Sequence, residues 1–275
     1  MTDNRPIGVF DSGIGGLTVL REIWNAVPGE STIYFGDNSR APYGTKSRST
    51  VIRYSLQNMK FLESKDVKMI VIACNTASAY AYEELKKRAN VPVVEVVTPG
   101  ADKACRATKN GKIGIIATKG TISTGVYKQA VERRAQELGL KDIEIFEQAC
   151  PLFVSLAEEG WWDTEVTRLT AEEYLKPLKE AGVDTLVMAC THYPLLSKVI
   201  GEVMGEGVTL VNTGEATAQV VKELLESESG SDDPVREFYT SDEPDLFEKV
   251  AAPFLGEGLP SGTKHFTTDR YEVTV

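Results

Sequence analysis

The chain repeats one order of segments in its two halves, and this repeat limits the folds open to it more than any other feature. Three motifs of the first half recur in the second half in the same order. The pairs are Ile7-Gly-Val-Phe with Ile113-Gly-Ile-Ile, Cys74-Asn-Thr with Cys190-Thr-His, and Thr98-Pro-Gly-Ala with Asn212-Thr-Gly-Glu. The members of these pairs lie 106, 116 and 114 residues apart. Matches that keep their order at nearly one offset indicate two copies of one structural unit.

Short apolar segments supply the expected strands of each unit. They lie at residues 7–10, 32–35, 69–73 and 93–97 in the first half, and at 113–117, 143–146, 185–189 and 208–211 in the second. Strands that are apolar on both faces are typical of parallel sheets covered by helices. Helix-forming stretches between them, such as 79–88, complete a βαβα order. We therefore predict an α/β fold of two similar domains with mostly parallel sheets, related by a pseudo-twofold axis.

Length and charge exclude several classes of protein. A chain of 275 residues is long enough for two domains. Its 30 basic and 40 acidic residues give a formal net charge of −10, which repels nucleic acid and anionic lipid. The four cysteines form no C-x-x-C pair, and no apolar run approaches the roughly 20 residues of a membrane helix. The first residues also lack the apolar region of a signal peptide. We expect a cytoplasmic protein with free thiols that binds neither nucleic acid nor a membrane.

Cys74 and Cys190 follow apolar strands at equivalent places in the two halves. Ligands of parallel α/β sheets bind beyond the carboxyl ends of the strands, so two facing domains would bring these thiols to opposite sides of one cleft. Inversion of a stereocentre needs such a pair, because one group removes a proton and another returns one to the opposite face. A thiol before a helix start can carry that proton. A single buried cysteine is most often a small apolar residue, but the matched placement favours catalysis.

Polar residues beside the thiols extend the candidate site. Asp11 follows the first strand and precedes a glycine-rich turn, where its carboxylate could hold an ammonium group or orient Cys74. Ser12 could cap the next helix or bind a substrate carboxylate. His192 lies two residues after Cys190, and in an extended segment this spacing puts both side chains on one side. The glycine spacing, G-x-G-G, differs from the dinucleotide and phosphate-loop motifs.

Other polar residues have both a binding and a structural interpretation, either as ligands of the substrate or as helix caps and turns. These residues are Tyr43, Gly44, Asn75, Thr76 and Thr191. In the segment Ala157-Glu-Glu-Gly, one carboxylate could be the counterpart of Asp11 in the second half, or it could lie at a solvated helix end.

Six motifs, read together, resemble one known family. They are Phe10-Asp-Ser-Gly-Ile-Gly-Gly-Leu-Thr-Val, Tyr34-Phe-Gly-Asp, Ala41-Pro-Tyr-Gly, Ala73-Cys-Asn-Thr-Ala, Cys150-Pro-Leu-Phe-Val and Ala189-Cys-Thr-His-Tyr-Pro-Leu. In this order and over nearly the whole chain, they resemble bacterial glutamate racemase, within the aspartate/glutamate racemase superfamily. The resemblance implies an isomerase that interconverts L- and D-glutamate with neither pyridoxal phosphate nor a metal. It further implies a homodimer that supplies D-glutamate for peptidoglycan, and so acts in cell-wall biogenesis and cell shape.

The resemblance also implies roles for particular residues. Cys74, assisted by Asp11, is expected to remove the proton from D-glutamate. Cys190, assisted by His192 and Glu158, is expected to remove it from L-glutamate. The pairs expected to hold the substrate are Asp11-Ser12, Tyr43-Gly44, Asn75-Thr76 and Thr191-His192. Ser155 stands where many relatives have proline, which leaves the choice between Glu158 and Glu159 open. The implied domains are 1–99 completed by 209–275, and 100–208, with the active site in the cleft between them.

Three other interpretations of the function fit part of the sequence. A racemase of aspartate or of hydantoins would share the two strand-end thiols. A Cys190–His192 pair could instead act as a nucleophile in acyl transfer, although this leaves Cys74 and the repeat unexplained. A non-catalytic binding protein of similar build is the third reading, together with a metal site formed by Cys74, Cys190 and His192.

Overall fold

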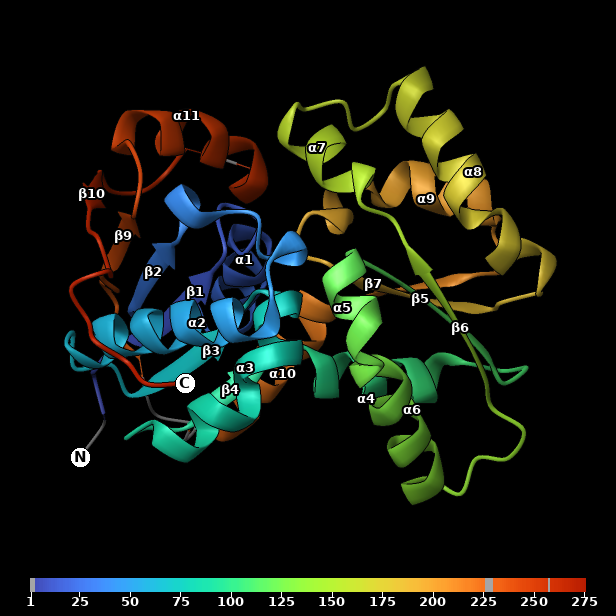
Figure 1. Ribbon diagram of the computed structural model, residues 1–275, viewed down its shortest axis with the longest axis horizontal. Helices are drawn as coiled ribbons and strands as arrows, with labels where there is room; N and C mark the ends of the chain where they lie inside the picture. Colours follow the sequence, from blue (N-terminus) through green and yellow to red (C-terminus); the bar gives the residue numbers. More distant parts are fainter. Residues whose placement is uncertain (1–2, 226–229, 257) are drawn as a thin grey trace.

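Two parallel sheets, each covered by helices, form the two lobes of the molecule (Figure 1). The computed structural model describes residues 3–225, 230–256 and 258–275. The first lobe contains the sheet β10-β9-β2-β1-β3-β4, and the second lobe contains the sheet β6-β5-β7-β8. The strands of the first sheet are β1 (Ile7–Asp11), β2 (Thr32–Gly36), β3 (Met69–Ile72), β4 (Val93–Glu95), β9 (Arg236–Thr240) and β10 (Thr263–His265). Those of the second are β5 (Lys112–Ala117), β6 (Glu144–Ala149), β7 (Thr185–Ala189) and β8 (Thr209–Asn212).

The repeat found in the sequence is present in the topology. Strands β2-β1-β3-β4 of the first sheet and β6-β5-β7-β8 of the second follow the same order, and all their pairings are parallel. The predicted α/β class with two parallel sheets is therefore confirmed. Two strands end two or more residues away from their predicted ends. β4 ends at Glu95 because α4 begins at Val97, and β6 continues to Ala149 as a half-exposed edge strand.

Alternating side chains of the strands pack against helices on the two faces of each sheet. In the first lobe, Val9 and Val71 face α1 and α10, whereas Phe10 and Ile72 face α2 and α3. In the second lobe, one face packs against α4 and α6 and the other against α7, α8 and α9. The helices are α1 (Leu17–Ala26), α2 (Arg48–Glu63), α3 (Asn75–Arg88), α4 (Val97–Ala107), α5 (Lys119–Thr124), α6 (Val126–Glu137), α7 (Leu152–Glu158), α8 (Glu165–Glu180), α9 (Ser197–Met204), α10 (Thr213–Leu224) and α11 (Pro244–Leu255). Within the described segments, none is both long and apolar enough to cross a membrane.

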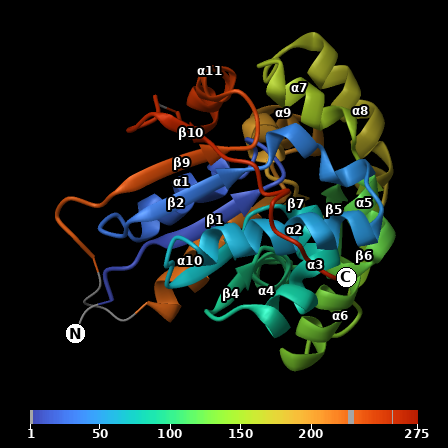
Figure 2. The ribbon, with the colours of Figure 1, turned by 60° about the vertical axis from the view of Figure 1, so that its left-hand side comes forward.

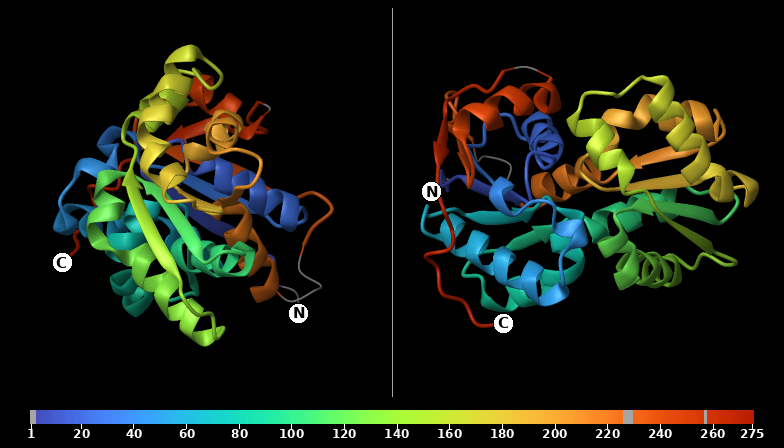
Figure 3. Two further views of the ribbon diagram at one scale, coloured as in Figure 1. Left: turned by 90° about the vertical axis from the view of Figure 1, so that its right-hand side faces the viewer. Right: turned by 45° about the horizontal axis from the view of Figure 1, so that its top comes forward.

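The described part of the chain crosses between the lobes twice. It passes from β4 in the first sheet to α4, which packs on the second sheet, and it returns after β8 through α10, which packs on the first. The expected boundary at residue 209 lies before β8, whose residues Thr209–Asn212 pair with β7 in the second sheet. The expected boundary at 99 falls inside α4. Figure 3 shows the two lobes side by side with these crossings between them.

The last part of the chain completes the first lobe. Strand β9 pairs with β2, and β10 pairs with β9 at the edge of the sheet. The final residues then run back along α2 and α3, as Figure 2 shows. Gln57 Nε2 of α2 donates to the carbonyl of Tyr271 at 2.9 Å, and Arg88 of α3 donates to the carbonyl of Thr274 at 2.6 Å. We call residues 266–275 the C-terminal tail.

Candidate active site

The candidate residues gather where the carboxyl ends of the two sheets approach each other. Asp11 ends β1, Cys74 follows β3, and Cys190 follows β7. All three side chains are buried. The strand-to-helix turns of a parallel sheet place polar side chains at this edge, and the repeat supplies one such edge from each lobe.

Cys74 is the N-cap of α3. Its Sγ accepts a hydrogen bond from the backbone N–H of Ala77 at 3.4 Å and lies 3.6 Å from Ser12 Oγ. Burial, followed by the negative charge of Asp11, raises the pKa of the Cys74 thiol to about 12. The thiol is therefore protonated at neutral pH unless a positive charge enters beside it.

Asp11 is fully buried, and one of its two oxygens has no partner. Oδ2 accepts the backbone N–H of Gly13 at 2.9 Å, whereas Oδ1 receives no hydrogen bond from the described residues. Burial raises the pKa of this carboxyl group, and the charge of His192 opposes that rise. A buried acceptor without a partner is costly, so Oδ1 is suited to receive a donor from a bound molecule.

Cys190 belongs to a three-residue relay in the second lobe. Its Sγ lies 3.8 Å from His192 Nδ1, and His192 Nε2 lies 3.0 Å from Glu158 Oε1. Burial lowers the pKa of His192, but the hydrogen bonds to Cys190 and Glu158 outweigh it, and the pKa rises to about 10. The ring is thus protonated at neutral pH. The partner of the ring is Glu158 and not its neighbour Glu159, a choice that the sequence left open.

Cys190 and His192 make the contact expected from their spacing, but through a turn and not through an extended segment. The segment after β7 is not extended, because His192 has helical backbone angles and Tyr193 N donates to the carbonyl of Cys190 at 3.1 Å. The tight turn, rather than strand alternation, brings the imidazole back to the thiol.

Residues of the first lobe contact the turn that carries Cys190. Thr18 Oγ1 of α1 donates to the carbonyl of Thr191 at 2.8 Å. A Cβ on Gly15 would lie only 2.3 Å from Thr191 Oγ1, so glycine lets the two lobes meet there. The turns that carry Asp11 and Cys190 are consequently held in direct contact.

Asn75 and Thr76, which begin α3, reach the second lobe. The hydroxyl of Tyr127 donates to Asn75 Oδ1, and Thr76 Oγ1 lies 3.0 Å from Thr118 Oγ1 and 3.1 Å from Thr121 Oγ1. The buried amide nitrogen of Asn75 has no acceptor among the described residues. Two buried groups of the site thus lack partners, the acceptor Asp11 Oδ1 and the donor Asn75 Nδ2, and they match the ammonium and carboxylate groups of an amino acid.

The Tyr43-Gly44 pair lies where the first lobe contacts Thr118 of the second lobe. The Tyr43 side chain is buried, and its hydroxyl donates to Asp37 and accepts from Asn58 Nδ2 at 3.1 Å. Gly44 lies against the second lobe, where a Cβ would come within 2.9 Å of Thr118. The hydroxyl of Tyr43 is thus already hydrogen-bonded to two residues of the first lobe, Asp37 and Asn58.

Sequence reasoning missed Thr18, Thr118, Thr121 and Tyr127. One signal for Thr118 was present, because it lies 106 residues after Ser12 and so occupies the same place in the repeat. The other three lie within helices, where nothing in the local sequence marks them.

The described residues do not support a metal centre beside the thiols, and a large cavity of the molecule lies elsewhere. In residues 3–225, 230–256 and 258–275, no three His, Cys, Asp or Glu side chains gather as a metal ion would require. A cavity of about 1060 Å³ lies between α1, α4, α6 and α10 and is lined by charged residues such as Glu22, Arg106 and Arg134. Neither Cys74 nor Cys190 lines that cavity, so it is separate from the candidate active site.

Comparisons with known proteins agree with this geometry. A family model described as Asp/Glu/Hydantoin racemase matches residues 7–221. The chain is 52% identical over 263 residues to a glutamate racemase of Geobacter metallireducens, with 93% of this chain and 94% of that protein covered.

Solved structures of similar proteins share the whole fold. Glutamate racemase isoform RacE1 of Bacillus anthracis matches with a TM-score of 0.88 and 35% identity, over 96% of this chain and 97% of that one. Glutamate racemase of Francisella tularensis, solved in complex with D-glutamate, matches with a TM-score of 0.87 and 35% identity, over 98% and 99% of the two chains.

Proposed function

The chain belongs to the Asp/Glu/hydantoin racemase family, and from this premise we propose that it interconverts L-glutamate and D-glutamate. The observation that carries the proposal is the pair of buried strand-end thiols, one from each lobe, beside a free buried acceptor and a free buried donor. Relatives that cover more than nine-tenths of the chain are named glutamate racemase, which favours glutamate over aspartate or a hydantoin.

In the proposed reaction, the two thiols act on opposite faces of the α-carbon. The thiolate of Cys74 takes the α-proton of D-glutamate, and the electron pair of the broken C–H bond remains on the carbon beside the carboxylate. The S–H group of Cys190 then gives its proton to the other face, which leaves L-glutamate and a Cys190 thiolate. The reverse reaction begins with that thiolate. Each direction breaks one C–H bond and forms another, so no other reactant is needed.

The substrate itself would help to ionise Cys74. Asp11 Oδ1 is placed to accept the substrate ammonium, and this positive charge would offset the carboxylate charge that raises the pKa of the thiol. Binding and activation are then one event, because the same cation satisfies Asp11 and stabilises the thiolate.

On the other face, His192 and Glu158 would support Cys190. His192 Nδ1 lies 3.8 Å from Cys190 Sγ, within reach of a proton exchange, and Glu158 holds the ring in place from its far side. A histidine fixed by a carboxylate keeps one orientation through the proton transfer.

Neutral donors would hold the substrate carboxylates. The candidates are the hydroxyl of Ser12, 3.6 Å from Cys74 Sγ, those of Thr76 and Thr191, and the amide nitrogen of Asn75. The backbone of Tyr43-Gly44, which meets the second lobe at Thr118, would add to them. The four residue pairs expected to hold the substrate contain no arginine. Neutral donors stabilise the charge that develops at the carbanion without binding the ground state too tightly.

The setting of the enzyme is also part of the proposal. We expect a homodimer in the cytoplasm that supplies D-glutamate for peptidoglycan. All four cysteines are free, as suits a reducing compartment, and the charge of −10 opposes binding to nucleic acid or anionic lipid.

Turnover of D-glutamate compared with D-aspartate tests the proposed substrate. We expect kcat/KM for D-glutamate to exceed that for D-aspartate by at least about 100-fold, because one methylene group changes where the second carboxylate meets its donors. Treatment with a chelator should leave the rate unchanged. Equal rates on both amino acids, or loss of activity to the chelator, would contradict the proposal.

An acyl-transfer enzyme is the second candidate, because Cys190 and His192 are in contact. That reading predicts a covalent acyl-enzyme on Cys190, visible as a mass increase of the intact protein after quenching. The racemase proposal predicts an unchanged mass during turnover of glutamate.

A further inference from the structure

The segment between β2 and α2 has little backbone structure of its own. Two short turns, η1 (Asn38–Arg40) and η2 (Tyr43–Thr45), are its only regular elements. Few of its N–H groups bond within the segment, for example Arg40 N to the carbonyl of Asp37 at 3.1 Å and Lys46 N to that of Tyr43 at 3.0 Å. Its side chains must therefore fix its position. We call residues 37–46 the Tyr43 loop.

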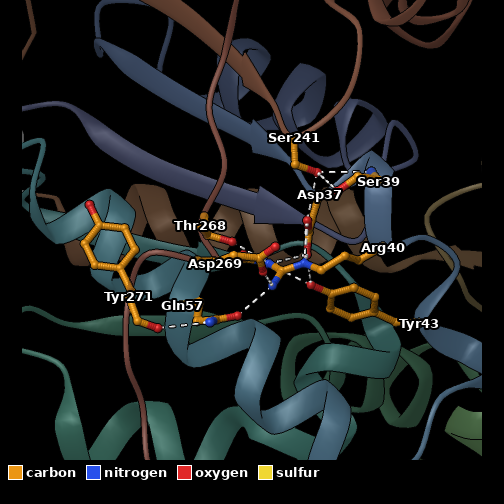
Figure 4. A network of polar contacts seen from close by, with 10 residues as sticks. Asp37, Ser39, Arg40, Tyr43, Gln57, Ser241, Thr268, Asp269 and Tyr271 are labelled. Atoms are coloured by element: carbon orange, nitrogen blue, oxygen red, sulfur yellow. Dashed lines mark hydrogen bonds and ion pairs between the residues drawn. The ribbon is translucent and has the colours of Figure 1, made fainter.

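Arg40 is the centre of the contacts that hold this loop (Figure 4). Its Nε donates to Asp37 at 2.8–2.9 Å. The other two nitrogens each donate twice, to acceptors in α2 and in the C-terminal tail. These acceptors are Gln57 Oε1, Asn58 Oδ1, Thr268 Oγ1 and Asp269 Oδ1. All five N–H groups of the guanidinium are thus used, and its Cζ lies 4.1 Å from the Tyr54 ring centroid.

Asp37 links Arg40 to the rest of the site. Its carboxylate, which is fully buried, accepts from Tyr43 and from Ser241 Oγ at 2.9 Å in addition to Arg40. Its backbone N–H donates to the carbonyl of Asp11 at 3.1 Å. Asp37 therefore fixes Tyr43 through its carboxylate and is hydrogen-bonded to Asp11 through its backbone.

The far end of the Tyr43 loop touches the second lobe. Gly44 lies against Thr118, and a Cβ on Gly120 would come within 2.8 Å of the Gly44 carbonyl oxygen. Thr118 in turn contacts Thr76, two residues after Cys74. A shift of the loop would therefore move the backbone of Tyr43-Gly44 and the hydroxyl group of Thr118 together.

We propose that Arg40 is a positioning residue for the Tyr43 loop, and that Thr268 and Asp269 of the C-terminal tail complete its support. Arg40 does not touch the substrate in this account. It holds Asp37 and, through it, Tyr43, so that Gly44 meets the second lobe beside the thiols. The inference rests on the proposed function, because it assigns the loop a part in glutamate binding.

The test measures KM and kcat for D-glutamate in Arg40→Lys and Thr268→Val. Lysine has three donors on one nitrogen and cannot serve acceptors on three sides, so we expect KM to rise roughly 10-fold with kcat within about 2-fold. Thr268→Val keeps the shape of the side chain and removes one acceptor. It should raise KM about 3-fold, and it decides the question if Arg40→Lys does not fold.

Lys68→Met is the matched control. Lys68 forms a buried ion pair with Glu30 at 2.5 Å, next to the start of β3 and at the opposite end of the sheet from the thiols. Its loss should lower the melting temperature and leave KM unchanged. A wild-type KM in the folded Arg40→Lys and Thr268→Val proteins, or the same rise in Lys68→Met, would overturn the inference. If the wild-type protein does not racemise glutamate, the proposed function fails, and this inference falls with it.

Discussion

At the scale of single residues, the two thiols have opposite electrostatic neighbours. Cys74 lies beside the Asp11 carboxylate, which raises the pKa of the thiol, whereas Cys190 lies beside a histidine whose own pKa is raised to about 10. Among the described residues, a cationic side chain lies beside the second thiol and not beside the first. In the proposed reaction the first thiol receives its cation from the substrate, so we expect the two directions of the reaction to respond differently to changes in these neighbours.

Replacement of Glu158 by Gln tests the relay to Cys190. We expect kcat/KM for L-glutamate to fall by roughly 10-fold or more, because His192 loses the carboxylate that orients it and raises its pKa. Glu159→Gln is the matched control, since Glu159 is exposed at the end of the same helix. Equal activity in the two variants would show that Glu158 has no part in the reaction.

The same relay predicts a dependence of stability on pH. The pKa of His192 is raised from 6.5 to about 10, so its protonated form stabilises the fold fully below about pH 6.5. That contribution is lost as the pH rises towards 10. In Glu158→Gln the folded-state pKa should be lower, so its melting temperature should decline less between pH 7 and pH 10. Parallel melting curves over this range for the variant and the wild type would be evidence against the assigned shift.

Asp11→Asn tests the free acceptor. The substitution keeps the size of the side chain but removes the charge that attracts an ammonium group, so KM for glutamate should rise by about 10-fold or more. The pKa of Cys74 should fall at the same time, because the carboxylate charge raises it. Steady-state kinetics and the pH dependence of Cys74 alkylation measure the two effects. An unchanged KM would remove Asp11 from substrate binding.

At the scale of elements, strand-to-helix turns place the site, and the sequence predicted much of this. Buried parallel strands are continuous apolar runs, so β1, β3, β5 and β7 were found within one or two residues. The repeat then aligned Cys74 with Cys190. Contacts between distant segments leave no such pattern in the sequence. Arg40 donates a hydrogen bond to Thr268, 228 residues away, and Asp37 accepts one from Ser241, 204 residues away. The tight turn at His192 was missed because the local spacing fits an extended segment equally well.

Gly15→Ala tests the contact between the turn before α1 and the turn after β7. The added methyl group would lie 2.3 Å from Thr191 Oγ1 and 2.6 Å from the His192 ring, so the turns must move apart. We expect a folded protein that loses at least about 100-fold in kcat/KM, because proton transfer depends steeply on the placement of both thiols. Gly207→Ala is the control, since a Cβ there meets nothing within 4 Å. Activity above a tenth of the wild-type value in Gly15→Ala would refute this account of the contact.

At the scale of the whole molecule, one repeated unit supplies the two faces of a single site. The sheets suggest that the first domain is residues 1–96 completed by 213–275, and the second is 97–212, and we propose this division in place of the one expected from the sequence. Each domain carries one of the two candidate catalytic thiols, Cys74 or Cys190, and the described part of the chain crosses between the domains twice. Small rotations about these crossings would change the distance between the thiols while each turn keeps its own geometry.

Racemisation in deuterium oxide by the wild type, Cys74→Ser and Cys190→Ser tests the central claim most directly. With D-glutamate or L-glutamate as substrate, the wild type should place solvent deuterium at the α-carbon of the product, because the incoming proton comes from the second thiol. Each serine variant should lose racemisation by at least about 1000-fold, since a hydroxyl is a far weaker base than a thiolate. Full racemase activity in either variant, or a product that keeps its original α-hydrogen, would contradict proton transfer by two opposed cysteines.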